Sequence, residues 1–365
     1  MTSGMAKLVL GFCAGLFWGG AAQAQAPYPA VHGKYYKFEK IADGVYYATA
    51  EYNGTAFPWG SNPFFGANLV VIVNDKDVVL VDTGTTPRSA HALVADIKKL
   101  TDKPIRTVIN THWHYDHTDG NSVFGPEVQI IATDYVRQQL STFDVVHNEP
   151  FALSTATAGP NLIAYFQKQI AAEKDAKAKA ALEKKLADTQ AALKEFEHDK
   201  TEIKITPPNM TYTNKMVLHR GAREIDLLFL GRGHTAGDTV VFLPKEKIAC
   251  TGDLMESRIA YMGSAYFDEW LTTLDALKRL DFTTDLPGHG APFTDKALIT
   301  AFQSYLRDLL VQAKKLRAQG VSADDAAKRV DMTAYAKAFP DILGPGVEVR
   351  GMRRIYAWMD EQKRK

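Results

Sequence analysis

Four potential metal ligands stand within six residues in the segment Thr111-His112-Trp113-His114-Tyr115-Asp116-His117-Thr118-Asp119-Gly120. This segment directly follows a short β-rich run at residues 105–110. Side chains repeat every two residues on an extended chain, so His112 and His114 should point to the same side. A turn after them can bring Asp116 and His117 to a second position. Because zinc accepts imidazole nitrogens and carboxylate oxygens, the segment predicts a metal site at a strand end.

Three later loops add ligand candidates. His234 lies in the Gly-flanked run Gly231-Arg232-Gly233-His234, Asp253 ends a β-rich run, and His289 stands between two glycines. Glycine lets the backbone approach a site closely, and this suits the position of His289. Each loop alone is a weak signal. With the first segment they give seven ligand candidates, a number that two metals need and one metal does not.

The motifs, together with Val81-Asp82-Thr83-Gly84, resemble those of the metallo-β-lactamase superfamily in content and order, from about Gly44 to Asp295. The resemblance implies an α/β fold, a four-layer αβ/βα sandwich with the metal site at one edge between the two sheets. It implies a first zinc ion held by His112, His114 and His234. It implies a second held by Asp116, His117 and His289, with Asp253 bridging both ions. Asp82 would not bind metal but would support the histidine segment, since ligands need fixed orientation.

Strands alternating with helices also indicate a layered α/β architecture. We expect a catalytic domain at residues 34–298, interrupted at about 160–202 by a long helical insert rich in Ala, Lys, Glu and Gln. The insert should be one long helix or a hairpin broken near residues 174–179, where apolar residues are missing. Residues 299–365 should form a helical C-terminal extension.

The first residues predict export. Lys7 is followed by an apolar run from Leu8 to Ala22 and by Ala22-Gln23-Ala24, the pattern of a secretory signal peptide at residues 1–24. The run is shorter than the roughly 20 residues that a membrane span needs, so we expect no membrane insertion after cleavage. The mature protein should be periplasmic or secreted. Cys13 and Cys250 cannot build a disulfide framework. With 43 Lys and Arg against 42 Asp and Glu, no charge excess favours nucleic acid as a partner.

The predicted centre is suited to hydrolysis of a small-molecule substrate. Two adjacent metal ions can share a water, lower its pKa and hold hydroxide for attack on the carbonyl of an ester, lactone or β-lactam. Asp116 would orient the hydroxide and carry a proton to the leaving group. We therefore expect a metal-dependent hydrolase with two zinc ions per chain. The sequence carries no signal for its oligomeric state.

The positions at which this chain departs from the best-known β-lactamases indicate its substrate. The best-known β-lactamases of the family carry cysteine where this chain has Asp253, and lysine three residues later, where it has Glu256. Asp253 resembles the glyoxalase-II and lactonase branches instead. Glu256 would repel the carboxylate of a β-lactam, so we expect neutral, apolar esters or lactones to react better. Arg232 and Arg258 are the alternative anchors for such a carboxylate.

An aromatic loop is the second clue to the substrate. Phe57, Trp59, Phe64 and Phe65 lie between two early strands and are too apolar for an idle exposed loop. They either line a pocket for an apolar substrate, with Tyr115 as a further candidate, or pack under the helical insert.

Other functions remain open on the same motifs. They are a β-lactamase proper, a glyoxalase-II-like thioester hydrolase, and a persulfide dioxygenase, which uses this fold with one iron bound by two histidines and an aspartate. The seven-ligand set favours two zinc ions over a single iron. A purely binding role is disfavoured by a complete ligand set.

Overall fold

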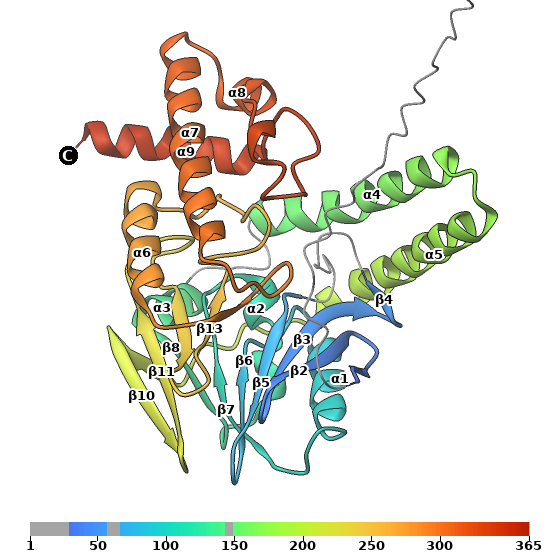
Figure 1. Cartoon of the computed structure of the whole chain (residues 1–365), viewed down its shortest axis with the longest axis vertical. Coiled ribbons are helices and arrows are strands. Elements are labelled where there is room, and N and C mark those ends of the chain that lie inside the picture. Colours follow the sequence, from blue (N-terminus) through green and yellow to red (C-terminus); the bar gives the residue numbers. More distant parts are fainter. Residues whose placement is uncertain (1–28, 57–65, 143–148, 365) are drawn as a thin grey trace, which may run out of the picture.

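Two β-sheets pack face to face in the computed structural model, which describes residues 29–56, 66–142 and 149–364 (Figure 1). In the first sheet the strands follow the order β1 (Val31–His32), β2 (Tyr36–Ala42), β3 (Val45–Tyr52), β5 (Leu69–Val73), β6 (Val78–Val81), β7 (Ile105–Ile109), β8 (Gln129–Thr133) and β9 (Met210–Tyr212), and β4 (Thr55–Ala56) pairs with β3. In the second sheet the order is β10 (Lys215–Arg220), β11 (Arg223–Phe229), β12 (Thr239–Leu243), β13 (Ile248–Gly252) and β14 (Thr284–Pro287).

Parallel neighbours set the position of the ligand loops. β6 and β7 run parallel in the first sheet, and β13 and β14 run parallel in the second. The carboxyl ends of parallel strands meet at one edge of a sheet. The segments that follow these four strands, which carry Asp82, His112, Asp253 and His289, therefore gather at one edge of the sandwich.

Helices cover both outer faces, as the αβ/βα prediction requires. Buried side chains such as Val79, Val81, Leu227 and Val241 form the core between the sheets. The first sheet is covered by α1 (Pro87–Ile97), α4 (Glu149–Ala172) and α5 (Ala176–Asp199). The second is covered by α6 (Phe267–Arg279), α7 (Ala297–Ala318) and α9 (Val349–Lys363), whose buried residues share one apolar cluster with Trp270. The remaining helical segments are α2 (Tyr115–Thr118), η2 (Asn121–Val123), α3 (Asp134–Thr142), η3 (Lys200–Glu202), α8 (Ala323–Arg329) and η4 (Thr333–Tyr335).

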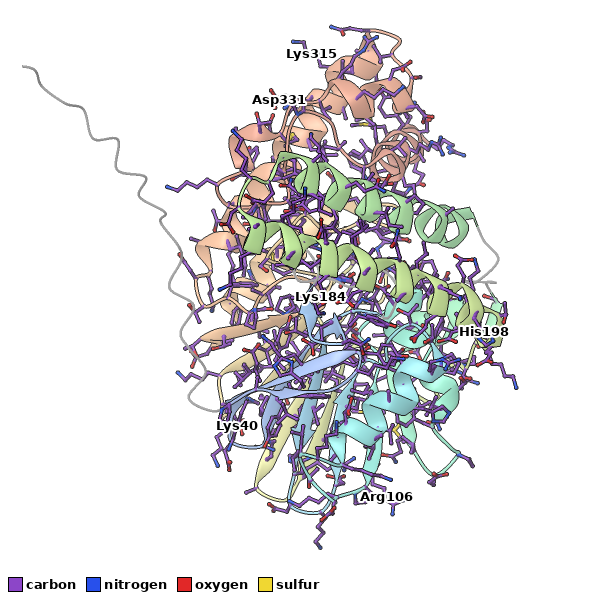
Figure 2. The ribbon with its side chains drawn as sticks, turned by 90° about the vertical axis from the view of Figure 1, so that its right-hand side faces the viewer. Lys40, Arg106, Lys184, His198, Lys315 and Asp331 are labelled. Carbon is purple, nitrogen blue, oxygen red and sulfur yellow. The ribbon has the colours of Figure 1, made fainter. Side chains whose placement is uncertain are left out.

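The insert is a helical hairpin that begins earlier than the sequence indicates. α4 starts at Glu149 and contains Pro160, the residue at which the expected insert begins. Proline usually marks a helix start or a kink, and the sequence therefore predicts that the insert starts at Pro160. In the structure the helix begins 11 residues earlier, at Glu149, and includes this proline. The hairpin bends at residues 173–175, and Asp175 caps α5 by accepting a hydrogen bond from Ala178 N. Figure 2 shows the two helices side by side, with Lys184 and His198 on α5.

The C-terminal helices belong to the same apolar core as α6. α7 begins at Ala297, two residues before the expected boundary, and packs on α6 through Phe302 and Leu306. The boundaries of the catalytic domain stay predictions. In the described part of the chain, no helix is both long and apolar enough to cross a membrane.

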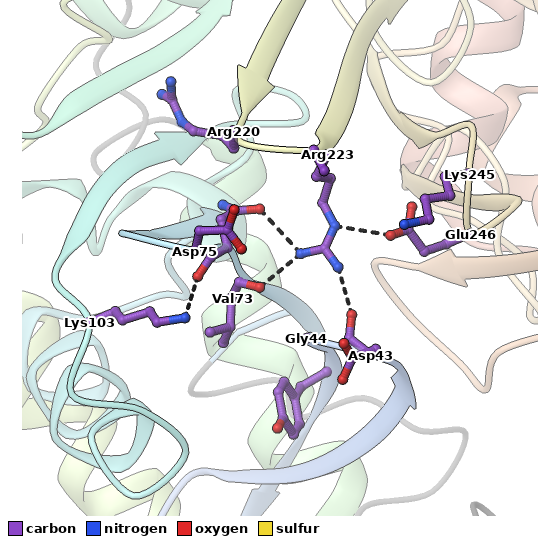
Figure 3. Close-up of a pocket in the computed structure, with 12 residues that line it drawn as sticks. Asp43, Gly44, Val73, Asp75, Lys103, Arg220, Arg223, Lys245 and Glu246 are labelled. Atoms are coloured by element: carbon purple, nitrogen blue, oxygen red, sulfur yellow. Dashed lines mark hydrogen bonds and ion pairs between the residues drawn. The ribbon is translucent and has the colours of Figure 1, made fainter.

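Arg223 fastens the two sheets at the edge away from the ligand loops, at the amino end of β6 (Figure 3). Its guanidinium donates to Val73 O at 2.8 Å, at the end of β5, and to Asp43 O at 2.6 Å, in the turn between β2 and β3. It also donates to Glu246 Oε1 at 3.0 Å in the second. The polar residues around Arg223 therefore have a structural role, because they hold the two sheets together.

Candidate metal centre

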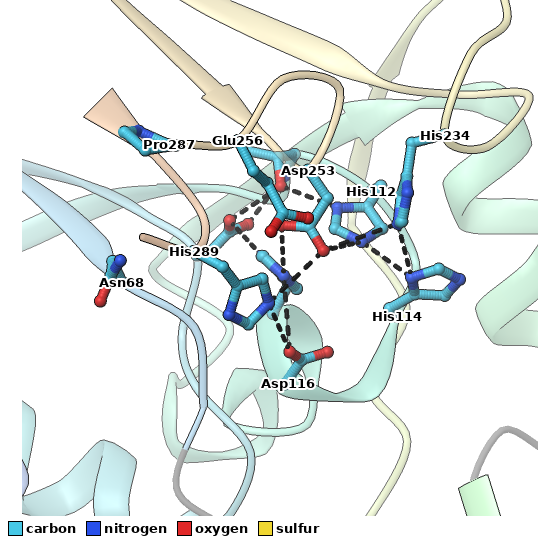
Figure 4. A network of polar contacts seen from close by, with 12 residues as sticks. Asn68, His112, His114, Asp116, His234, Asp253, Glu256, Pro287 and His289 are labelled. Carbon is cyan, nitrogen blue, oxygen red and sulfur yellow. Dashed lines mark hydrogen bonds and ion pairs between the residues drawn. The ribbon is translucent and has the colours of Figure 1, made fainter. Parts of the chain in front are cut away.

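The structure brings all seven predicted ligands together (Figure 4). β7 ends at Ile109, and the chain then turns into α2, with His114 at its N-cap and with Asp116 and His117 in its first turn. The other three ligands come from the second sheet. His234 lies in the loop after β11, and Asp253 and His289 follow β13 and β14.

Three imidazoles form the first donor group with Asp253. His114 Nδ1 lies 3.0 Å from His112 Nε2 and 3.0 Å from His234 Nε2. Asp253 Oδ2 lies 3.7 Å from His112 Nε2 and 3.6 Å from His234 Nε2. The three imidazoles turn one nitrogen each toward a common point. Neutral imidazoles in this arrangement cannot all be satisfied by hydrogen bonds to one another, whereas a cation at that point would accept the lone pair of each nitrogen.

The second donor group shares Asp253. Asp116 Oδ2 lies 3.0 Å from His289 Nε2 and 3.7 Å from His117 Nε2. Asp253 Oδ1 lies 3.3 Å from His117 Nε2, and its Oδ2 lies 3.4 Å from His289 Nε2. One carboxylate thus stands between the two groups, at the place expected of a bridging ligand.

The buried polar atoms of the site fit a metal. Among the described residues, His117 Nε2 and Asp253 Oδ1 are buried and make no well-formed hydrogen bond, although they face each other at 3.3 Å. Buried polar atoms are nearly always satisfied, so such atoms in a donor cluster indicate a missing partner. Nitrogen and carboxylate donors together suit zinc.

The first donor group is held in the protonation state that binds metal. Burial is the main cause that lowers the pKa of His112 and His114 well below the usual value for histidine, and their histidine neighbours lower it further. Burial also lowers the pKa of His234 to about 4. These imidazoles are therefore neutral at pH 7, as metal ligands must be.

The second group differs in charge. Burial disfavours the charged form of its histidines, but the charge of Asp253 and the hydrogen bonds to Asp116 and Asp253 together outweigh it and raise the pKa of His289 to about 9. The pKa of His117 also lies well above its usual value, because Asp253 and Asp116 outweigh burial. Burial raises the pKa of Asp116, but the charge of His117 together with the hydrogen bond and charge of His289 outweighs it and lowers the pKa to about 2. The histidines of the second group are thus held toward their protonated form, unlike those of the first.

Asp82 lies behind the histidine segment, where the resemblance places it. Its Oδ1 accepts a hydrogen bond from Thr111 N at 2.8 Å, and its Oδ2 accepts one from Thr111 Oγ1 at 2.8 Å. Oδ2 also lies 2.7 Å from His117 Nδ1, so the other nitrogen of His117 turns toward the donor group. Thr111 Oγ1 lies 3.1 Å from His112 Nδ1. Thr111 was not predicted, although its place directly before His112 was a signal.

Tyr47 and Asn68 support the His289 loop, and no sequence motif indicated them. Asn68 N donates to Gly288 O at 2.7 Å, and Asn68 Nδ2 donates to Gly290 O at 2.9 Å. The hydroxyl of Tyr47 lies 2.8 Å from Pro287 O and accepts a hydrogen bond from Asn68 Nδ2 at 2.6 Å. Both side chains are buried, so they fix the backbone on either side of His289.

Both arginine candidates for a substrate anchor are paired with carboxylates. Arg258 Nε lies 2.8 Å from Glu256 Oε2, and Glu256 is fully buried. Arg232 forms a two-pronged contact with Glu269, with Nε 2.6 Å from Oε2.

The remaining pocket candidates are Tyr115 and the aromatic loop. Tyr115 is half-buried and packs against the apolar clusters beside α3 and the first sheet. Phe57, Trp59, Phe64 and Phe65 lie outside the described residues.

Known proteins are similar to this chain in sequence and in fold. The model of the metallo-β-lactamase superfamily matches residues 62–129. A linear primary-alkylsulfatase of Pseudomonas sp. (strain ATCC 19151) is 21% identical over 296 residues, covering 77% of this chain and 53% of the alkylsulfatase. This chain therefore spans about half the length of that relative. A metallo-β-lactamase type 2 of Elizabethkingia meningoseptica is 22% identical over 249 residues, covering 67% of this chain and 73% of the relative.

A solved structure, the metallo-β-lactamase from Pontibacter korlensis, shares the fold. Its TM-score is 0.51 at 18% identity, and the match covers 74% of this chain and 99% of that one. The family match, the curated relatives and the sandwich architecture agree with the order of the ligand motifs. The chain thus resembles the metallo-β-lactamase superfamily in its family match and its curated relatives.

Proposed function

We propose that the protein is an exported dinuclear zinc hydrolase that cleaves an ester-like bond in a small molecule. The observation that carries this proposal is the position of Asp253, whose carboxylate lies within 3.7 Å of nitrogens of both donor groups. A shared carboxylate between a three-histidine group and an Asp-His-His group is suited to two metals rather than one. Export rests on the predicted signal peptide at residues 1–24.

Zinc at such sites supplies a Lewis acid and lowers the pKa of bound water toward 7. The chain itself supplies the proton carrier. Asp116 keeps 17% of its side chain exposed, whereas Asp253 keeps 4% and His117 none. Asp116 is therefore the carboxylate that a substrate can approach. We assign it to orient the attacking water and to pass a proton to the leaving group.

The charges beside the site favour neutral esters or lactones over anionic β-lactams. Burial and the charge of Asp253 raise the pKa of Glu256 to about 7, and Arg258 neutralises what charge remains. The repulsion expected from Glu256 is therefore weaker than the sequence suggests. A β-lactam carboxylate nevertheless finds no unpaired anchor in either arginine candidate, since Arg232 is committed to Glu269. Capture of the carboxylate would require one of these ion pairs to break.

A second candidate function is sulfate-ester hydrolysis. The relative that matches the larger share of this chain is named as a linear primary-alkylsulfatase. In a sulfate ester, attack of an activated water on the tetrahedral sulfur would break the bond between sulfur and the ester oxygen and release an alcohol and sulfate.

Metal analysis and a substrate screen test the proposal. We expect two zinc ions per mature chain, and turnover of aryl esters or lactones above that of penicillins, carbapenems, thioesters and primary alkyl sulfates. One tightly bound iron with oxygen-dependent turnover would replace the hydrolase by a dioxygenase. A penicillin or an alkyl sulfate with kcat/KM far above every ester and lactone would overturn the substrate ranking but keep the hydrolase. N-terminal sequencing of the exported protein tests cleavage after Ala24.

A further inference from the structure

His114 differs from the other histidines of the first donor group in the nitrogen it presents. Its Nδ1 faces His112 and His234, whereas its Nε2 lies 3.1 Å from Ser264 Oγ. A neutral imidazole carries one proton, so a ring that offers Nδ1 as a ligand carries the proton on Nε2. Nε2 therefore donates to Ser264 Oγ, and this bond selects both the tautomer and the ring orientation.

Ser264 lies in the irregular segment between β13 and α6, residues 253–266, which starts at the bridging Asp253. Within this segment Ala265 N donates to Met262 O at 3.2 Å, and Tyr266 N donates to Gly233 O at 2.9 Å. The second bond ties the end of the segment to the loop that carries His234. A segment without regular structure needs further contacts to hold a hydroxyl in place.

The C-terminal extension supplies these contacts. Arg354 Nε on α9 donates to Ala265 O at 3.0 Å, next to Ser264. Asp341 Oδ2 accepts a hydrogen bond from Ile259 N at 3.0 Å, and the guanidinium of Arg350 lies 4.6 Å from the centre of the Tyr261 ring. The Tyr261 ring in turn packs edge-on against His114, with 5.5 Å between ring centres.

We propose that α9 is a positioning element for the metal centre, and that it acts by holding Ser264 against His114. The proposal rests on the proposed metal-binding function. It assigns Ser264 as the positioning residue for the first metal and Arg354 as the residue that acts through Ser264. Partners of the non-ligating nitrogen of a histidine typically contribute 10- to 100-fold to metal affinity.

Metal affinity measured by competition with a chromophoric chelator tests this proposal without any substrate. We expect Ser264→Ala to weaken zinc binding at the tighter of two sites about 10-fold or more, and Ser264→Thr to restore most of it. We expect Arg354→Ala to weaken the same site. In the double variant the two losses should not add, because residues that act through one contact are coupled.

Arg353→Ala is the matched control. Arg353 lies on the same helix but pairs with Asp324 of α8 at 2.7 Å, so we expect its loss to leave zinc affinity unchanged. Unchanged affinity in Ser264→Ala, or additive losses in the double variant, would overturn the positioning role. Wild-type protein that binds no zinc would instead overturn the proposed function, and the inference with it. If Arg354→Ala fails to fold, the Ser264 pair of variants still decides the question.

Discussion

The bridging role of Asp253 makes Asp253→Ala the most informative substitution in the metal centre. The side chain is 4% exposed, and its two oxygens contact histidines of both donor groups at 3.3 to 3.7 Å. Removal of this carboxylate leaves His112, His114 and His234 as a complete three-nitrogen set of neutral imidazoles. We therefore expect one zinc ion to stay and the fold to be retained.

The second zinc ion should be lost because of charge. Two dications about 3.5–4 Å apart repel each other, and a carboxylate between them offsets that repulsion. Loss of one partner from a buried charge pair typically costs about 3–5 kcal/mol. Since about 1.4 kcal/mol corresponds to a tenfold change, the ion that binds second should bind roughly a hundred- to a few thousand-fold more weakly.

Elemental analysis after dialysis against chelators of increasing strength measures this loss. We expect two zinc ions in the wild type, one in Asp253→Ala, and activity that falls with the second ion. Asp226→Ala is the control, because this buried carboxylate pairs with Lys215 at 2.8 Å outside the metal centre. Two tightly held zinc ions and unchanged turnover in Asp253→Ala would refute the bridge and with it the reasoning from the Asp253 distances.

Three further outcomes are expected. Asp82→Asn should weaken zinc binding about 10- to 100-fold in chelator competition, because its carboxylate holds Thr111 and His117 Nδ1; full affinity would speak against that support. Metal removal should lower the Tm by on the order of 10 °C, since a ligand at a thousandfold excess over Kd adds about 4 kcal/mol; equal Tm values with and without chelator would contradict this. His289 has a pKa raised to about 9 and must lose its proton to bind metal, so affinity for the second zinc should rise between pH 7 and pH 9; calorimetry in buffers of different ionisation enthalpy should detect the released proton, and a flat pH profile would count against this ligand.

The fold and the ligand set could be predicted because their signals are local or ordered along the chain. The histidine segment carries four ligands on one strand end and one helix turn, and the glycines around His289 mark a close approach. The parallel pairs β6–β7 and β13–β14 then bring these segments to one edge. The start of the insert was less predictable, because Pro160 indicates a helix start locally, whereas tertiary packing continues α4 through this residue.

The supporting residues could not be predicted because their contacts span the chain. Tyr47 and Asn68 reach the His289 loop from more than 200 residues away, and Ser264 is 150 residues from His114. A serine or a tyrosine in an ordinary strand or loop carries no signal of such a partner. The Glu256–Arg258 pair is different, since residues two apart on an extended chain share a side. That spacing could have shown that the charge of Glu256 is compensated.

Metal affinity and substrate choice both depend on one continuous segment, residues 253–266. Residues 253–266 begin with the bridging Asp253, continue through the Glu256–Arg258 ion pair and end beside Ser264, which contacts His114. The C-terminal extension fixes this segment through Asp341 and Arg354. On the proposal that Ser264 positions His114, a substitution in this segment that admits a new substrate should also change zinc affinity. Substrate preference among such variants should therefore be compared at saturating zinc. Below saturation, a variant that has lost metal would be mistaken for one with changed specificity.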